Sequence, residues 1–189
     1  MKELLFTGAG TALVTPFDKS GNIAWDEIEK LVEYQIESGI DALIACGTTG
    51  EAATMTSEEH LKTIDFIIQK SKGRVPVIAG TGSNDTQFCV ELSLQAKKLG
   101  ADGLLLVTPY YNKTSQKGLV ESFNYIADSV QMPCILYNVP GRTGCNILPE
   151  TYYELSKNPY VVATKEANGD TVSVAKTAAM CGDELTIYS

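Results

Sequence analysis

This sequence contains little histidine, and its cysteines are scattered rather than clustered. Its 189 residues include one histidine, His60, and five cysteines that form no C-x-x-C pair. A zinc site needs clustered histidine and cysteine ligands, so the sequence argues against a metal site. Free cysteine in or beside an apolar run behaves as a small hydrophobic residue. We therefore expect all five cysteines to be reduced and structural: Cys46, Cys89, Cys134, Cys145 and Cys181.

Long hydrophobic runs and excess positive charge are also missing. No stretch approaches the ~20 apolar residues of a membrane-spanning helix, and residues 1–6 are too short and polar for a signal peptide. The net charge of −8 argues against a nucleic-acid or anionic-membrane partner. We expect a cytoplasmic protein with one domain over residues 1–189, a length that can bury a core of its own.

What the sequence does contain is an alternation of short apolar runs and amphipathic segments. Helical spacing of apolar residues covers 25–36, Ser57 opens a second helix with an acidic first turn, and Asn84 is expected to cap a third. The runs begin roughly thirty residues apart, the size of a βαβ unit, so a parallel sheet is predicted. The expected strands are 8–17, 42–46, 75–81, 104–108, 134–139, 161–167 and 185–189.

Two parallel architectures fit this alternation, an open doubly wound sheet and a closed barrel. The open sheet is typically marked by a G-x-G-x-x-G loop after its first strand; Gly8-Ala9-Gly10 matches it only in part, because Thr11 and Leu13 continue the strand. Polar residues gather at the carboxyl ends of several strands, as in a TIM (β/α)₈ barrel. The chain supplies six strand-helix units and a seventh strand, whereas a whole barrel has eight units and about 250 residues. The predicted fold is an incomplete, truncated α/β barrel.

Lys165 is the most informative residue, because it stands near the end of the apolar run 161–167. Strand side chains alternate between faces, so Lys165 shares its face with Val161 and Ala163. A buried ammonium costs several kcal/mol unless its pKa falls or it finds a partner, and a neutral lysine is a nucleophile for a carbonyl. The alternative is a lysine that extends out to solvent at the strand end.

The preceding strand carries two further candidates. Tyr137 shares a face with Ile135 and Val139, so it should point toward the same side as Lys165 and could move protons for the carbinolamine and imine of a Schiff base. Arg142 follows in a loop with flanking glycines and offers a guanidinium suited to a carboxylate. A surface ion pair is the alternative for Arg142.

Two more strand-end loops carry hydroxyl groups. Thr48 and Thr49 lie between Gly47 and Gly50, where amides and hydroxyls could cradle a carboxylate; a turn with hydroxyl caps is the alternative. Tyr111 follows the fourth strand and could supply a phenol for proton transfer, or serve as a packing or interface residue.

Three strings in combination closely resemble the dihydrodipicolinate synthase family. They are Gly47-Thr48-Thr49-Gly50-Glu51, Tyr137-Asn138-Val139-Pro140-Gly141-Arg142-Thr143-Gly144 and Lys165-Glu166-Ala167, and the resemblance extends from about Gly8 to Ser189. That family belongs to the class I, Schiff-base-forming lyases related to N-acetylneuraminate lyase.

The resemblance implies a reaction and a role for each candidate. Lys165 would form a Schiff base with pyruvate, and the resulting enamine would attack aspartate semialdehyde, the first committed step of diaminopimelate and lysine biosynthesis. Tyr137, Thr48 and Tyr111 resemble the proton relay, with Tyr111 contributed across the dimer interface of a homo-oligomer, a dimer or a tetramer. Thr49 resembles the residue that binds the pyruvate carboxylate and Arg142 the one that binds the semialdehyde carboxylate. No cofactor or metal is implied, because the iminium supplies the electron sink.

Other interpretations stay open. The chain could be another 2-keto acid aldolase of the superfamily, an inactive barrel fragment that self-associates, or an unrelated α/β protein that binds phosphate at the Gly47–Gly50 loop. We expect low activity unless another copy completes the barrel. Weak or absent inhibition by lysine is also expected, because three residues stand where lysine-sensitive relatives show serine, histidine and glutamate: Ala52, Ser57 and Phe88.

Overall fold

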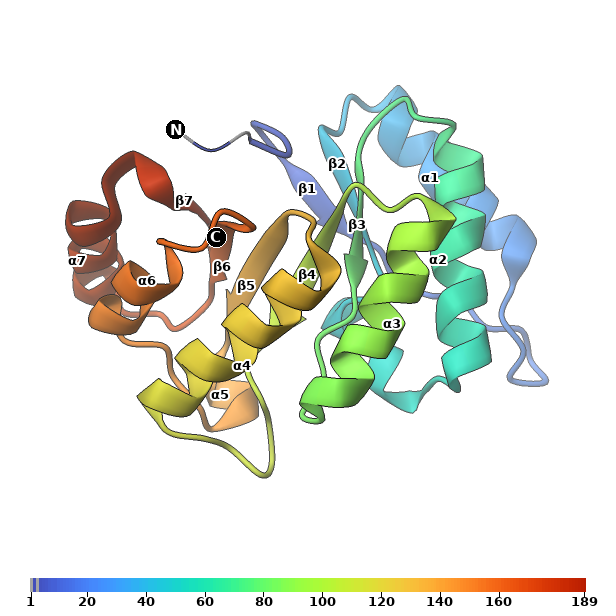
Figure 1. The fold of residues 1–189 in the computed structure, drawn as a ribbon. Coiled ribbons are helices and arrows are strands. Elements are labelled where there is room, and N and C mark those ends of the chain that lie inside the picture. Colours follow the sequence, from blue (N-terminus) through green and yellow to red (C-terminus); the bar gives the residue numbers. More distant parts are fainter. Residues whose placement is uncertain (1, 3) are drawn as a thin grey trace. The chain divides into compact units, whose positions relative to one another are not determined.

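The computed structural model describes Lys2 and residues 4–189, which group into two compact units. The N-terminal unit comprises Leu5–Thr81 and Leu92–Leu104, and the C-terminal unit comprises Gly82–Glu91 and Leu105–Ser189 together with Lys2 and Leu4 (Figure 1). The boundary passes through α3 (Thr86–Leu99) and β4 (Gly103–Val107). The expectation of a single domain over residues 1–189 stays a prediction.

Strands and helices alternate along the chain as the apolar runs predict. The other strands are β1 (Gly10–Ala12), β2 (Ala42–Ala45), β3 (Val77–Gly80), β5 (Cys134–Asn138), β6 (Val161–Glu166) and β7 (Thr186–Tyr188). The other helices are α1 (Trp25–Glu37), α2 (Ser57–Ser71), α4 (Gln116–Val130), α5 (Pro140–Thr143), α6 (Pro149–Leu155) and α7 (Thr171–Cys181), with short 3₁₀ turns at Thr48–Gly50, Ala52–Thr54 and Gly182–Glu184.

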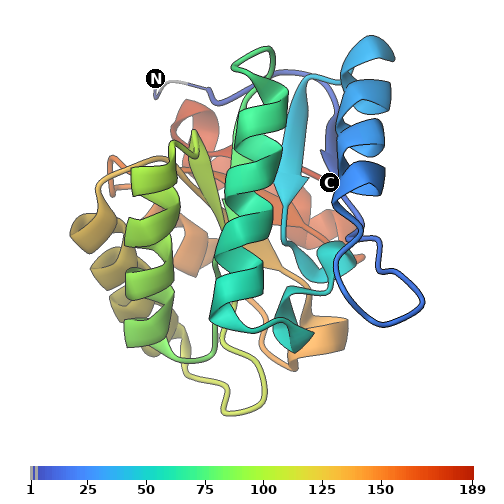
Figure 2. The same ribbon diagram turned by 90° about the vertical axis from the view of Figure 1, so that its right-hand side faces the viewer.

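In the N-terminal unit, β1, β2 and β3 pair in parallel, with Ala12 opposite Ile44 and Ile44 opposite Ile78. Every residue of β2 and β3 is buried. Helices α1 and α2 pack side by side against these strands (Figure 2). A strand buried on both faces has to be apolar throughout, which is why these strands read as continuous hydrophobic runs.

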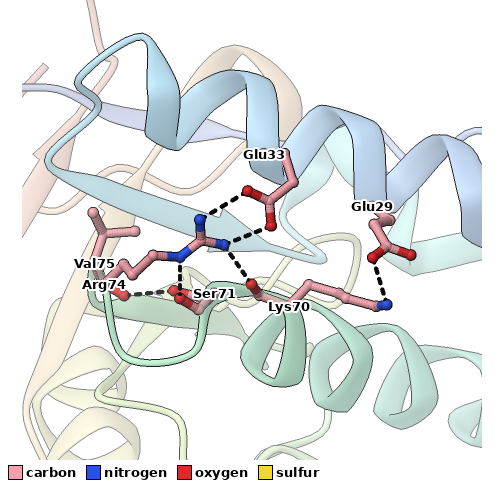
Figure 3. A network of polar contacts seen from close by, with 6 residues as sticks. All are labelled: Glu29, Glu33, Lys70, Ser71, Arg74 and Val75. Carbon is pink, nitrogen blue, oxygen red and sulfur yellow. Dashed lines mark hydrogen bonds and ion pairs between the residues drawn. The ribbon is translucent and has the colours of Figure 1, made fainter.

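A polar cluster joins α1 to α2 and to the turn that follows α2, and we call it the exposed clasp: Glu29, Glu33, Lys70 and Arg74 (Figure 3). The Arg74 guanidinium donates to both carboxylate oxygens of Glu33 at 2.8 and 2.7 Å. Lys70 Nζ lies 2.6 Å from Glu29 Oε1. The paired guanidinium holds the pKa of Glu33 below its ordinary value.

In the C-terminal unit, β5, β6 and β7 also pair in parallel. The register shifts once, between Cys134 and Ile135, so that Ile135 lies opposite Ala163 and Tyr137 opposite Lys165. Helix α6 packs against both α4 and α7 (Figure 1). All five cysteines of the chain are free and buried, as expected of small hydrophobic residues.

Helix starts and the first strand differ from the sequence predictions. Thr56, not Ser57, caps α2: it accepts from the Glu59 amide while the Glu59 carboxylate accepts from the Thr56 amide. Asp85, not Asn84, caps α3, because its carboxylate accepts from the Phe88 amide at 3.0 Å. Strand β1 has three residues rather than the ten of 8–17. Pro16 has no amide hydrogen to continue the ladder, and Phe17 pairs instead with Ile23 in an antiparallel bridge.

Candidate active site

Lys165 and Tyr137 lie together on one face of the C-terminal unit, as the alternation of strand side chains predicts. They are register partners on β6 and β5, and Lys165 Nζ lies 4.5 Å from the centroid of the Tyr137 ring. The amine thus rests over the face of the ring, the side from which an aromatic ring attracts a cation.

Burial sets the electrostatics of this pair. Lys165 is half-buried and Tyr137 is buried. Because burial disfavours the charged ammonium, the pKa of Lys165 is lowered from its ordinary value. A lowered pKa leaves more of the amine neutral near neutral pH, and the neutral amine is the form that attacks a carbonyl.

Arg142 is presented to solvent by the short helix α5. Pro140 opens the turn with its preset φ, and Gly144 ends it at a φ of +66°, a value that glycine adopts without steric cost. The buried Thr143 hydroxyl anchors the turn: it accepts from Thr108 at 3.1 Å and donates to the Cys145 carbonyl at 2.9 Å. The anchored turn leaves the Arg142 guanidinium exposed and available to an anion.

Tyr111 occupies a backbone conformation that is uncommon for a side chain of its size. Its φ is +67°, a value that costs a non-glycine residue of order 1 kcal/mol or more. The loop is held by Asn112, whose amide donates to the Tyr110 carbonyl and whose side chain donates to the Asn84 carbonyl at 3.0 Å. Tyr111 is 92% exposed, so its ring contacts almost nothing of its own chain.

Thr48 and Thr49 belong to the N-terminal unit, in the 3₁₀ turn that follows β2. The Gly50 amide closes this turn on the Gly47 carbonyl, and the buried Thr15 hydroxyl donates to the Gly50 carbonyl at 2.8 Å. Both threonine side chains are exposed. That they act with Lys165 stays a prediction.

Sequence reasoning missed a second group of polar residues, which lies on the helix-covered face of β5 and β6. We call it the Glu166 network: Glu166, Tyr152, Asn138, Asn146 and Thr164. The Glu166 carboxylate accepts from Tyr152 Oη and from Asn138 Nδ2, each at 2.9 Å. Asn138 Nδ2 also donates to Asn146 Oδ1 at 2.8 Å, and the Thr164 hydroxyl donates to Tyr152 Oη at 3.0 Å.

Burial shapes the chemistry of this network too. Glu166 is 5% exposed, and Asn138, Tyr152 and Thr164 are fully buried. Burial raises the pKa of Glu166, while hydrogen bonds from Tyr152 and Asn138 act in the opposite direction. Burial likewise raises the pKa of Tyr152, which keeps its hydroxyl protonated as a donor. A carboxylate inside an apolar run was the available signal, because a buried charge needs partners.

The described part of the chain offers no cluster of three or more histidine, cysteine, aspartate or glutamate side chains that could hold a metal ion. Within the same residues, no helix is long and apolar enough to cross a membrane.

Parallel strands that alternate with helices fit the class of (β/α)₈-type barrels, in which site residues lie at the carboxyl ends of strands, as Lys165 does on β6. This chain carries six βα units and a seventh strand of such a barrel. The model of the Dihydrodipicolinate synthetase family matches residues 5–189, and the chain belongs to that family.

Individual relatives agree with this assignment. The 4-hydroxy-tetrahydrodipicolinate synthase of Acetivibrio thermocellus is 52% identical over 189 residues, which are 100% of this chain and 64% of that protein. A dihydrodipicolinate synthase from Acinetobacter baumannii, solved with pyruvate, superposes with a TM-score of 0.95 at 46% identity, covering 96% of this chain and 62% of that one. The enzyme from Bacillus anthracis has a TM-score of 0.95 at 42% identity, covering 100% of this chain and 64% of that one. The chain spans a little under two thirds of the length of these relatives.

Proposed function

We propose that this chain carries the Schiff-base site of a lyase that condenses pyruvate with aspartate semialdehyde, in diaminopimelate and lysine biosynthesis. The observation that carries the proposal is the half-buried Lys165 amine, with its lowered pKa, over the ring of Tyr137. Family membership and the pyruvate in the Acinetobacter baumannii structure support the choice of first substrate.

The proposed chemistry begins at the Lys165 amine. The neutral nitrogen attacks the ketone carbon of pyruvate, and loss of water from the carbinolamine leaves an iminium. The iminium withdraws electrons from the adjacent methyl group, which loses a proton to give an enamine. The enamine carbon then attacks the aldehyde carbon of the semialdehyde. Attack by that substrate's own amine at the former ketone carbon closes the ring and releases Lys165.

The other candidate residues have proposed roles in binding and proton transfer. Tyr137, Thr48 and Tyr111 relay protons, Thr49 binds the pyruvate carboxylate, and Arg142 binds the semialdehyde carboxylate. Because Tyr111 is almost fully exposed, we propose that it acts in the site of a second copy within a homo-oligomer, a dimer or a tetramer. A cytoplasmic location also stays a proposal.

Reductive trapping with pyruvate tests the central step. Incubation with pyruvate and cyanoborohydride should add one reduced pyruvate at Lys165, located by peptide mass spectrometry, and Lys165→Ala should abolish the adduct. Lys157→Ala is a matched control, because Lys157 is an exposed lysine of the same unit. A folded protein without an adduct at Lys165 would support a non-catalytic fragment instead.

The second substrate needs a test of its own. Arg142→Ala should leave trapping by pyruvate intact, because Arg142 is assigned to the semialdehyde carboxylate. In a coupled assay, the wild-type protein should consume pyruvate only when aspartate semialdehyde is also present. Turnover with a different aldehyde, and none with aspartate semialdehyde, would assign the chain to another 2-keto acid aldolase.

Feedback by lysine is proposed to be weak or absent. Phe88, Ala52 and Ser57, the first residue of α2, offer no charged partner to a cationic effector. Isothermal titration with lysine should show no micromolar binding.

A further inference from the structure

The Glu166 network lies one residue behind the proposed site on both of its strands. Glu166 follows Lys165 on β6, and Asn138 follows Tyr137 on β5. Across the two strands, Tyr137 is the register partner of Lys165, and Asn138 is the register partner of Glu166. Since neighbouring residues on a strand point to opposite faces, the network backs the Lys165–Tyr137 pair from the face that α6 covers.

The hydrogen bonds of the network are saturated at its centre. Asn138 uses both amide hydrogens, one to Glu166 and one to Asn146, and its Oδ1 accepts from the Ile147 amide at 3.1 Å. The Glu166 carboxylate uses one oxygen for Asn138 and the other for Tyr152. Because each group has a single buried arrangement that satisfies it, the ends of β5 and β6 are held in one relative position.

The same network reaches the segment that carries Arg142. Residues 139–146 leave β5 after Asn138 and return to it where Asn146 and Ile147 bond the Asn138 side chain. Asn138 therefore closes the base of this loop. A change at Glu166 that releases Asn138 should loosen both the Lys165–Tyr137 pair and the Arg142 loop.

We propose that Glu166, Tyr152 and Asn138 are positioning residues, which hold Lys165 against Tyr137 and fix the base of the Arg142 loop by hydrogen bonds on the opposite face of the strands. The inference rests on the proposed function for its catalytic consequence, but its structural part does not need pyruvate. Reactive groups must be held within about 0.5 Å of productive geometry, which gives such a network its effect on rate.

Geometry rather than charge is the means of action. The lowered pKa of Lys165 has burial as its cause. A glutamine at position 166 can accept from Asn138 and donate to Tyr152 Oη, which can then donate to the Thr164 hydroxyl. Thr164 has the Leu136 carbonyl, 3.2 Å away, as its own acceptor. Glutamine thus preserves the links to Asn138 and Tyr152, whereas alanine removes both.

The test compares Glu166→Ala, Glu166→Gln and Tyr152→Phe, with Tyr153→Phe as the matched control on the exposed side of α6. The rate of trapping at Lys165 is measured against pyruvate concentration, and circular dichroism confirms the fold. Glu166→Ala should lower the maximal trapping rate about tenfold or more, and Glu166→Gln should restore most of that loss. Tyr152→Phe should show a smaller loss, and it carries the test if Glu166→Ala does not fold.

Two results would overturn the proposal. A folded Glu166→Ala protein that traps pyruvate at the wild-type rate would remove the positioning role. A Glu166→Gln protein as impaired as Glu166→Ala would assign the effect to the carboxylate charge.

Hydrogen exchange separates this proposal from the proposed function. Amides of residues 139–147 should exchange faster in Glu166→Ala and Tyr152→Phe, but not in Tyr153→Phe. If wild-type protein does not trap pyruvate, the proposed function fails, and the exchange result still decides on positioning. Unchanged exchange in both variants would contradict it.

Discussion

The exposed clasp and the Glu166 network each join neighbouring elements, the first in the N-terminal unit and the second in the C-terminal unit. The exposed clasp connects α1 with α2 and with the turn after it through two ion pairs, and the Arg74 and Glu33 side chains remain 35% and 37% exposed. The Glu166 network connects β5, β6 and α6 in the interior, where Glu166 is 5% exposed. Water can replace a lost partner in the clasp, whereas a lost partner in the interior leaves a donor without an acceptor. The two networks should therefore respond differently to the removal of a single group.

The largest expected effect is that of Glu166→Ala on stability. Asn138 Nδ2 and Tyr152 Oη would both lose their acceptor inside the protein, which should lower the free energy of unfolding by about 3 kcal/mol. Urea denaturation followed by circular dichroism measures the loss. Glu121→Ala, which removes an exposed glutamate from α4, is the control. An equal loss in both variants would show that the buried hydrogen bonds of Glu166 add nothing to stability beyond what an exposed glutamate contributes.

Tyr152→Phe should have the next largest effect. It keeps the ring and removes only the hydroxyl, so Glu166 loses one donor, and about 1.5 kcal/mol is expected. Tyr153→Phe in the same helix should leave the denaturation midpoint unchanged, because that ring lies at the surface over Lys157. Equal midpoints for the two variants would count against a buried hydrogen bond at Tyr152.

Glu166→Gln should alter the pH dependence of stability more than stability itself. Burial raises the pKa of Glu166, so the folded state binds its proton more tightly than the unfolded state. This tighter proton binding stabilises the folded state below the ordinary glutamate pKa of about 4.3. The stabilisation is lost as pH rises through the raised pKa. The variant lacks this loss, so its stability relative to wild type should increase with pH across that window. Parallel curves would show that Glu166 does not titrate differently on folding.

The smallest effect is expected for Glu33→Gln in the exposed clasp. The exposed Glu33 carboxylate is screened by water and salt, so its removal should lower Tm less than Tyr152→Phe does. The difference from wild type should shrink further when melting is repeated at high salt. A loss as large as that of Tyr152→Phe, unchanged by salt, would contradict the comparison.

Much of the fold could be predicted from hydrophobic pattern. Each predicted strand except the first matches the observed bounds within two residues, because strands buried on both faces must be apolar throughout. Helix starts were less predictable. Neighbouring polar residues compete for the cap, and the choice of Thr56 and Asp85 over Ser57 and Asn84 depends on which side chain reaches a free amide. The length of strand β1 was overestimated, because an apolar run does not show where pairing with the neighbouring strand stops.

The candidate site, too, could be predicted only in part. The alternation of side chains on β5 and β6 correctly placed Tyr137 and Lys165 on one face. It could not reveal the positive φ of Tyr111, in a loop whose next residue, Asn112, bonds to the distant Asn84 carbonyl. Nor could it reveal that Tyr152 and Asn138 meet Glu166, since that needs the register of two strands and the approach of a helix.

By itself, the sequence determined the family, the order of strands and helices, and the faces on which Lys165 and Tyr137 lie. All of these depend on local periodicity or on short motifs. Only the tertiary structure decided how far Lys165 is buried, how Arg142 and Tyr111 are presented, and which groups satisfy Glu166. These properties depend on groups far apart in the chain, because desolvation and hydrogen bonding are set by whatever folding brings within a few ångströms.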